Sequence, residues 1–420
     1  MRVLHVSDLH LGRELLGVSR QREHEALVAE LVEVAETRAV DLTVIAGDVF
    51  DTVNPPAWAE DAFYGLVDGL AAGGRRAVVV VAGNHDNAMR LAAAQPLAAR
   101  AGIWLCGELD AAPRAFTRPG YARLEPLGPG AALVTSADGE RRVAVGALPF
   151  VSEARLVRLQ RTEVEDEATD RDAYADALAR AFAARKACLP DGVPHLLIGH
   201  LWVSGGAAAD SERVYRIGGL SDLRAGDLPG ADYLALGHLH RPQSISGAPG
   251  PGPVVYSGSP LAWSASETGQ QKRIVLVDLP RPGETHLESV PVRAGRPVRE
   301  WTVRSEAELD ARVAAEVRES PIVFLRVDYG RVLSRDESSG LHRKGVTFVD
   351  VRVRGEATAE VDDPSDAFAD GLPEDVLLET FLGGEGHTPA YAAELAADLL
   401  ALLRDEPPGM PAEALDEVEA

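Results

Sequence analysis

The sequence predicts an α/β protein, and the order of its first elements is the main reason. Three short apolar runs typical of buried strands alternate with two stretches of helical periodicity. Each apolar run is followed at once by polar residues that suit ligand chemistry. Such alternation favours a parallel sheet, in which ligands bind in the crevice outside the carboxyl ends of the strands.

The first strand is predicted at residues 3–6 and is followed by Asp8 and His10. These two side chains can project to the same side, because strand side chains repeat with a period of two residues. The second strand, residues 42–46, leads directly to Asp48. The helices that connect the three strands are predicted at residues 20–37 and 56–71.

The third strand, residues 78–82, leads into Gly83-Asn84-His85-Asp86, where an amide, an imidazole and a carboxylate follow one another. Gly83 allows the backbone to turn sharply after the strand. Taken alone, the tetrapeptide fits an ordinary turn as well as it fits a ligand site. Its significance comes from similar residues at other strand ends.

The same pattern continues later in the chain. A strand at residues 195–199 ends at His200, and a buried strand at residues 232–236 is followed by His238 and His240. The intervening segments are predicted as a helix interrupted at Pro96, hairpin strands between residues 103 and 148, a helix over residues 151–188 and a loop over residues 204–219. We expect all these strand ends to lie along the same edge of one sheet.

Composition restricts the protein class. No apolar run approaches the roughly 20 residues of a membrane span, and the first residues lack the features of a secretory signal. Two cysteines, Cys106 and Cys188, are too few for a disulfide framework. We therefore expect a cytoplasmic protein. The net charge of −23 argues against a generic nucleic-acid coat, so DNA binding would need cations that are local, metal-borne or supplied by another subunit.

A Pro- and Gly-rich segment at residues 279–283 marks a predicted boundary. Beyond it, Ser305 fits a helix N-cap with Glu308 three residues later, within a small α+β pattern. We predict a first domain over residues 1–280, an α+β domain over 281–358, C-terminal helices over 359–404 and an acidic, disordered tail over 405–420.

Seven candidate ligands follow these strands: Asp8, His10, Asp48, Asn84, His200, His238 and His240. Oxygen and imidazole donors together suit divalent Mn, Fe or Zn better than Mg²⁺. Seven ligands are too many for one catalytic ion, whereas two ions sharing a carboxylate would use them all and could act on a phosphoryl group. Asp48 is the natural bridge. The isolated His5, His24 and His195 stay unassigned, and Asp51 fits either a turn or a supporting role.

The strand-end motifs that contain these seven candidate ligands resemble the five motifs of the calcineurin-like metallophosphoesterases. Within that superfamily, the segments at residues 45–52, 235–243 and 256–260 resemble the SbcD-type DNA repair nucleases. The resemblance covers residues 1–278 and implies a metallophosphoesterase β-sandwich with flanking helices. It also implies that the α+β domain is a small capping domain. One departure concerns Asp51, where archaeal and eukaryotic members commonly carry a second catalytic histidine.

The resemblance also implies roles for individual residues. Asp8, His10, Asp48 and His240 would surround one Mn²⁺ ion, and Asp48, Asn84, His200 and His238 the other. His85 would lie outside the ligand set as a catalytic residue that holds the scissile phosphate and assists the leaving 3′ oxygen.

The function implied is an Mn-dependent DNA nuclease, a single-stranded DNA endonuclease and double-stranded 3′–5′ exonuclease that processes double-strand breaks and hairpins. Its implied partner is an SbcC-type ATPase, with the nuclease as a homodimer within a heterotetramer. The C-terminal helix over residues 388–404, with a leucine stripe, would contact that ATPase or dock on its own chain. Two alternatives use the same residues: a metal-dependent small-molecule phosphodiesterase and a non-catalytic scaffold. The length beyond residue 278 and the complete ligand set disfavour them.

Overall fold

The structure is a computed structural model that describes residues 1–353 except residues 116, 152–166, 214–222, 329–339 and 344. The predicted C-terminal helices and acidic tail lie outside the described residues. So does the first part of the helix predicted over residues 151–188.

The first of two large sheets has six strands in the order β13-β12-β1-β2-β3-β4. Strands β1 to β4 are parallel, β12 is antiparallel to β1, and β13 pairs with β12 as a hairpin. The strands are β1 (Arg2–Val6), β2 (Leu42–Ala46), β3 (Ala77–Val81), β4 (Ile103–Cys106), β12 (Arg273–Arg281) and β13 (Glu284–Pro291). The division predicted between residues 280 and 281 lies inside this hairpin.

The second sheet has seven strands in the order β10-β11-β9-β8-β7-β6-β5. Its central strands β7, β8, β9 and β11 are parallel. The strands are β5 (Arg123–Gly128), β6 (Ala131–Thr135), β7 (Arg142–Leu148), β8 (His195–His200), β9 (Tyr233–Gly237), β10 (Gln243–Ile245) and β11 (Val254–Tyr256).

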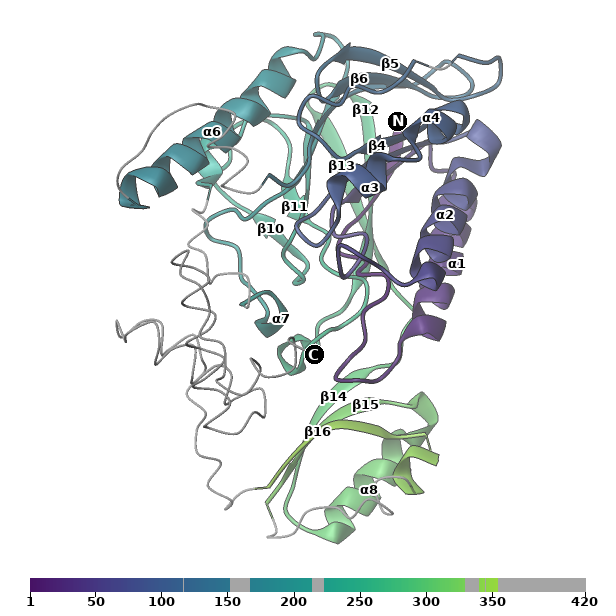
Figure 1. Ribbon diagram of the computed structural model, residues 1–420, viewed down its shortest axis with the longest axis vertical. Helices are drawn as coiled ribbons and strands as arrows, with labels where there is room; N and C mark the ends of the chain where they lie inside the picture. The colour runs from purple at the N-terminus through teal and green to yellow at the C-terminus, as the bar shows by residue number, and fades with distance from the viewer. Residues whose placement is uncertain (116, 152–166, 214–222, 329–339, 344, 354–420) are drawn as a thin grey trace, which may run out of the picture. The chain divides into compact units, whose positions relative to one another are not determined.

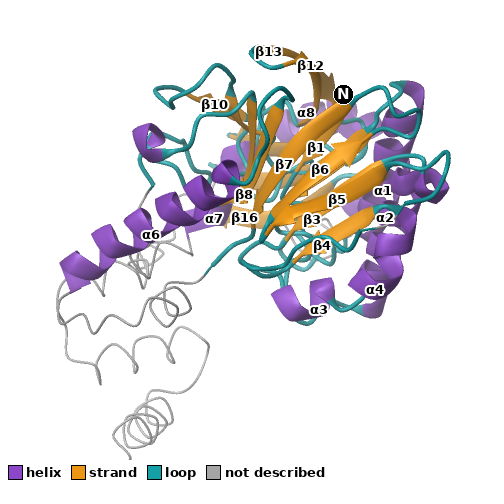
Figure 2. Cartoon of the chain, turned by 90° about the horizontal axis from the view of Figure 1, so that it is seen from above, coloured by secondary structure: helices purple, strands orange, loops and turns teal. Residues whose placement is uncertain are grey.

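The two sheets pack face to face, and helices cover their outer faces (Figures 1 and 2). Along β3, Val79 and Val81 belong to the core shared with the second sheet, whereas Val78 and Val80 pack in the core beneath helices α1 (Gln21–Thr37) and α2 (Ala57–Ala71). Helix α6 (Glu167–Ala187) packs on the second sheet. Burial on both faces explains why the strands are continuously apolar in sequence.

The expectation of one sheet was wrong. The residues after β1, β2 and β3 belong to the first sheet, whereas those after β8 and β9 belong to the second. An apolar run shows that a strand is buried on both faces, but it carries no information about which sheet the strand joins. The β-sandwich with flanking helices is confirmed.

Short helices lie in the connections between strands: α3 (Ala88–Ala92) and α4 (Gln95–Ala98) between β3 and β4, and α7 (Asp210–Arg213) between β8 and β9. Single 3₁₀ turns are found at Ala72–Gly74, Ala99–Ala101, Ala225–Asp227 and Ala265–Glu267. Helix α7 lies within the segment predicted as a loop. In the described part of the chain, no helix is both long and apolar enough to cross a membrane.

A separate three-stranded parallel sheet follows, in the order β14-β15-β16. Its elements are β14 (Val298–Val303), α8 (Glu306–Glu316), a 3₁₀ turn (Val317–Glu319), β15 (Ile322–Val327) and β16 (Thr347–Val353). Ser305 caps α8 as predicted, because its hydroxyl accepts from the Glu308 amide at 3.2 Å. Trp301, Leu309 and Leu325 form part of its small core.

Candidate metal centre

The carboxyl ends of the two sheets meet closely, and glycines make this possible. A Cβ on Gly237, at the end of β9, would lie 1.8 Å from the carbonyl oxygen of Ala46 at the end of β2. A Cβ on Gly47, just after β2, would lie 2.1 Å from Nδ1 of His200 at the end of β8. Side chains from both sheets therefore converge in one site, which the structure builds from all eight predicted residues: Asp8, His10, Asp48, Asn84, His85, His200, His238 and His240.

One group of ligand atoms comes from Asp8, His10 and His240, which lie within 4.8 Å of one another. The Nε2 atoms of His10 and His240 are 3.0 Å apart. A second group surrounds Asn84, whose Oδ1 lies 2.9 Å from His200 Nε2 and 3.0 Å from His238 Nδ1.

Asp48 lies between these two groups. Its Oδ1 is 3.4 Å from His200 Nε2, and its Oδ2 is 3.7 Å from His10 Nε2. A carboxylate in this position can contribute one oxygen to each group, which is the geometry that a bridging ligand requires.

The partners of the outer ring nitrogens indicate where the imidazole lone pairs point. His200 Nδ1 lies 2.9 Å from the Ala46 carbonyl, which can only accept a hydrogen bond, so Nδ1 carries a proton. The lone pair of His200 Nε2 then points into the site, towards Oδ1 of Asn84 and Oδ1 of Asp48. Lone pairs aimed at neighbouring acceptors repel unless a proton or cation lies between them, so this donor set fits divalent ions.

Electrostatics support the same conclusion. Asp8 and Asp48 are almost completely buried, and in the described part of the chain their ion-pair partners are histidines. Burial raises the pKa of Asp8 to about 7. Burial also opposes ionisation of Asp48, yet His200 and neighbouring imidazoles lower its pKa below the usual range. Burial opposes protonation of His200 as well, but Asp48 raises its pKa to about 9. Without metal, the negative charge of the buried Asp48 carboxylate is balanced by the protonated His200 ring. A bound divalent cation can balance that charge instead.

The backbone is strained where it supplies these ligands. Asp8, His10, Asp48 and His238 have φ of 54°, 45°, 48° and 104°. Residues other than glycine seldom adopt such values, and they persist only where the surrounding structure enforces them.

His85 lies at the edge of the site, 10% exposed at its side chain. Its Nδ1 is 2.7 Å from the Asp51 carbonyl, and its Nε2 is 3.9 Å from Asp48 Oδ2. Its ring meets that of His10 edge-on, with centroids 4.7 Å apart. The Asp51 carbonyl therefore orients the ring so that Nε2 faces the ligand groups.

Sequence reasoning missed the residues that support the ligands. The Asp86 carboxylate accepts from the amides of Gly83, Val49 and Phe50 at 2.8, 3.1 and 2.9 Å, and so ties the loop after β3 to the loop after β2. Burial raises the pKa of Asp86 to about 6. Its position in the Gly83–Asp86 motif was the available signal, because a carboxylate next to a turn often accepts from backbone amides.

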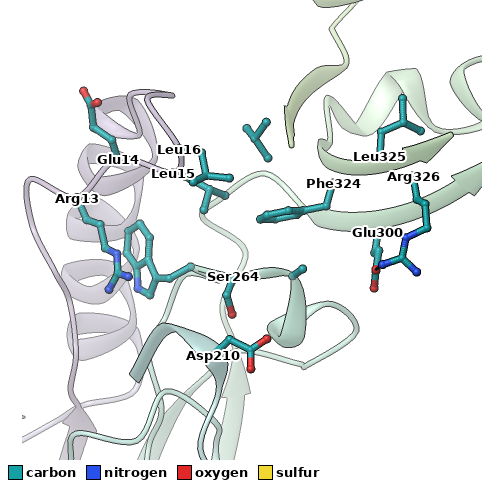
Figure 3. Close-up of a pocket in the computed structure, with 13 residues that line it drawn as sticks. Arg13, Glu14, Leu15, Leu16, Asp210, Ser264, Glu300, Phe324, Leu325 and Arg326 are labelled. Carbon is teal, nitrogen blue, oxygen red and sulfur yellow. Dashed lines mark ion pairs between the residues drawn. The ribbon is translucent and has the colours of Figure 1, made fainter. Parts of the chain in front are cut away.

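A pocket of about 720 Å³ adjoins the site. Arg13, Leu15 and Leu16 lie on one side of it, and Glu300, Phe324 and Arg326 lie on the other (Figure 3). Trp263 links it to the ligands, because the Arg13 guanidinium lies 5.2 Å from the Trp263 ring centroid and His10 lies 6.0 Å from it, ring to ring.

Residues 1–242 match the calcineurin-like phosphoesterase family. The fold, this match and the ligand groups define a metal-dependent phosphodiester hydrolase.

Curated relatives resolve the class further. The chain is 40% identical over 302 residues to the SbcD subunit of the nuclease SbcCD from Bacillus subtilis, covering 72% of each sequence. The SbcD subunit from Rhodobacter capsulatus is 37% identical to this chain over 282 residues, which cover 66% of each of the two sequences. The SbcD subunit from Escherichia coli K12 is 31% identical over 303 residues, which cover 71% of this chain and 70% of that subunit. The chain belongs to the SbcD family of calcineurin-like phosphoesterases.

Proposed function

We propose that this protein is an Mn²⁺-dependent DNA nuclease with two metal ions in its site. The observation that carries the proposal is the position of Asp48, between two groups of buried ligands, in a chain whose relatives are named nucleases. Two divalent ions, when bound, would neutralise charge on the phosphate and activate water at neutral pH.

The ligand assignment follows the two groups. Asp8, His10 and His240 would hold one ion, and Asn84, His200 and His238 the other, with Asp48 shared. His200 would bind through Nε2, because its Nδ1 faces the Ala46 carbonyl, and His10 and His240 would bind through the Nε2 atoms that face each other. His238 would bind through Nδ1, the atom that faces Asn84.

His85 would contact the reacting phosphate. With Nδ1 directed at the Asp51 carbonyl, Nε2 faces the ligand groups, 3.9 Å from Asp48 Oδ2, where the phosphate would bind. A proton on Nε2 would stabilise charge on the scissile phosphate or pass to the leaving 3′ oxygen.

The metal ions offer an answer to the unfavourable net charge. Arg13 and Arg326 line the pocket beside the site, but so do Glu14, Asp210 and Glu300. Each arginine also lies near a carboxylate, Arg13 at 3.6 Å from Asp51 and Arg326 at 4.0 Å from Glu300. We propose that the two metal ions provide the local positive charge that the whole chain, at −23, lacks.

The particular activities proposed are endonucleolytic cleavage of single-stranded DNA and 3′–5′ exonucleolytic cleavage of double-stranded DNA. The relatives' name describes one component of a nuclease, which supports a larger assembly. We propose a homodimer within a heterotetramer with an SbcC-type ATPase, acting in the cytoplasm on double-strand breaks and hairpins.

The central test combines substrate and metal. Purified protein with Mn²⁺ should cleave plasmid DNA, and Asp48→Ala should abolish both cleavage and the binding of two ions measured by calorimetry. Two tightly bound ions in the variant would refute the bridging role. Turnover of bis-p-nitrophenyl phosphate without any DNA cleavage would instead favour the small-molecule phosphodiesterase.

The partner is tested with the C-terminal helices, which rest on sequence alone. Leu399→Glu, or truncation before Pro373, should leave Mn²⁺-dependent cleavage of single-stranded DNA intact while removing co-purification with an SbcC-type ATPase and stimulation by ATP. Unchanged affinity of the truncated protein for that ATPase would show that the leucine stripe packs on its own chain.

A further inference from the structure

A buried ion pair between Lys272 and Glu267 contacts His240, one of the candidate ligands, and has no assigned role. The Glu267 side chain is fully buried, and the Lys272 ammonium donates to its Oε2 at 2.5 Å. Lys272 also donates to the carbonyl oxygen of His240 at 3.0 Å. Burying a charged pair costs free energy unless additional hydrogen bonds satisfy both groups.

Those additional bonds converge on Glu267. Its Oε1 accepts from the Trp263 amide at 3.0 Å, from the Ser264 hydroxyl at 3.1 Å and from the Ser211 hydroxyl at 2.9 Å. The carboxylate is therefore fixed by backbone and side chains from two separate segments. It can serve as a rigid acceptor for Ser211.

Ser211 connects this acceptor to the metal centre. Its Oγ lies 2.7 Å from His240 Nδ1. A serine hydroxyl has one proton, and the carboxylate of Glu267 can only accept. Once that proton is directed at Glu267, the Ser211 oxygen must accept from Nδ1–H of His240.

We propose that Ser211 is a positioning residue that holds His240 as the Nδ1–H tautomer, with Glu267 and Lys272 orienting the serine. The Nε2 lone pair of His240 then points towards Nε2 of His10, 3.0 Å away, where a cation would bind. Metal-binding histidines commonly donate their other nitrogen to a carboxylate or carbonyl. Here the Ser211 hydroxyl lies between the two groups: it accepts from His240 Nδ1–H and donates to the Glu267 carboxylate. The inference rests on the proposed metal-dependent function for its purpose, but the contact between Ser211 Oγ and His240 Nδ1 is present without metal.

A merely structural role is the alternative, in which Glu267 and Lys272 only anchor residues 259–272 and the contact with His240 is incidental. The two roles differ in what happens to the His240 ring. An anchor would affect stability alone, whereas a positioning group sets the tautomer and the affinity for metal.

The experiment uses the full chain labelled with ¹⁵N-histidine, without metal, and long-range ¹H–¹⁵N spectra that distinguish the two tautomers. The His240 signals are identified by their loss in His240→Gln. Wild-type protein should show His240 as Nδ1–H, and Ser211→Ala should convert it to a mixture of tautomers. Ser211→Thr, which keeps the hydroxyl, should restore the wild-type spectrum.

Mn²⁺ titration by calorimetry provides the second readout. Ser211→Ala should weaken one of two sites by roughly 10- to 100-fold, the usual effect of losing a group that orients a ligand. Ser264→Ala is the matched control, because it removes one hydrogen bond to Glu267 without touching His240, and it should leave tautomer and affinity unchanged.

An unchanged His240 tautomer in Ser211→Ala, or an Mn²⁺ affinity equal to that of wild type, would overturn the proposal. Equal losses in Ser211→Ala and Ser264→Ala would also overturn it, because they would indicate an anchor. Failure of the nuclease function is distinguishable: wild-type protein would then bind no Mn²⁺ or cleave no DNA, while the metal-free spectra would still report on Ser211.

Discussion

Gly237→Ala tests whether the site depends on close contact between the two sheets. The added Cβ would lie 1.8 Å from the Ala46 carbonyl oxygen, although real Cβ contacts essentially never fall below 3.0 Å. It would also lie 2.9 Å from His200 Nδ1. The ends of β2 and β9 must therefore separate by about 1.2 Å at the point where they hold ligands.

The expected cost can be estimated from two terms. Overpacking a close-packed interior costs about 1–3 kcal/mol. The hydrogen bond from His200 Nδ1 to the Ala46 carbonyl would be lost or lengthened, for about 0.5–1.5 kcal/mol more. We expect urea unfolding to show a loss of about 2–4 kcal/mol. Calorimetry should show weaker Mn²⁺ binding at the site that includes His200.

Gly65→Ala is the matched control. Gly65 lies in α2, and a Cβ there meets no atom within 4 Å. Alanine should stabilise the helix by about 0.5–1 kcal/mol and leave Mn²⁺ binding unchanged. If Gly237→Ala were as stable as wild type and bound two ions with normal affinity, the argument that glycine permits the sheets to meet would be refuted.

Three further predictions concern the site and its surroundings. His85→Leu should slow DNA cleavage by roughly 10²- to 10⁴-fold with near-normal Mn²⁺ occupancy, and normal turnover or loss of a metal would contradict the catalytic role. Removal of metal by a chelator should lower the midpoint of thermal unfolding, because an ion present at about 1,000 times its Kd stabilises the folded state by about 4 kcal/mol. A midpoint that does not depend on Mn²⁺ would argue against the proposed metal site. Burial lowers the pKa of His5, next to the Tyr233 hydroxyl at 2.9 Å, to about 3. As the pH drops below about 6.5, His5 therefore takes up a proton in the unfolded chain but not in the folded one, and the free energy of unfolding decreases. In the wild type this histidine should account for about 2 kcal/mol of the loss in unfolding free energy between about pH 7.5 and pH 5, and His5→Gln should remove that part of the loss. An identical pH profile of stability in His5→Gln would refute this.

The candidate ligand residues could be singled out in the sequence because each one lies at, or shortly after, the end of a buried strand. Asp8, Asp48 and His200 are recognisable from an apolar run that ends in a polar residue, and this local pattern survives folding unchanged. Ser211 was not predictable, since it lies in a segment with loop-like composition and its function comes only from contact with Glu267, 56 residues away.

Local periodicity and side-chain chemistry are enough to establish the strands, the order in which they occur and the residue types at their ends. They do not establish that the strands form two sheets, that Asp48 lies between two ligand groups, or which ring nitrogen of each histidine faces inward. The physical reason is that these properties arise from contacts between distant segments: Gly237 against Ala46, Ser211 against His240 and the histidines against buried carboxylates. The positive φ angles of Asp8 and Asp48 are likewise seen only in the folded chain.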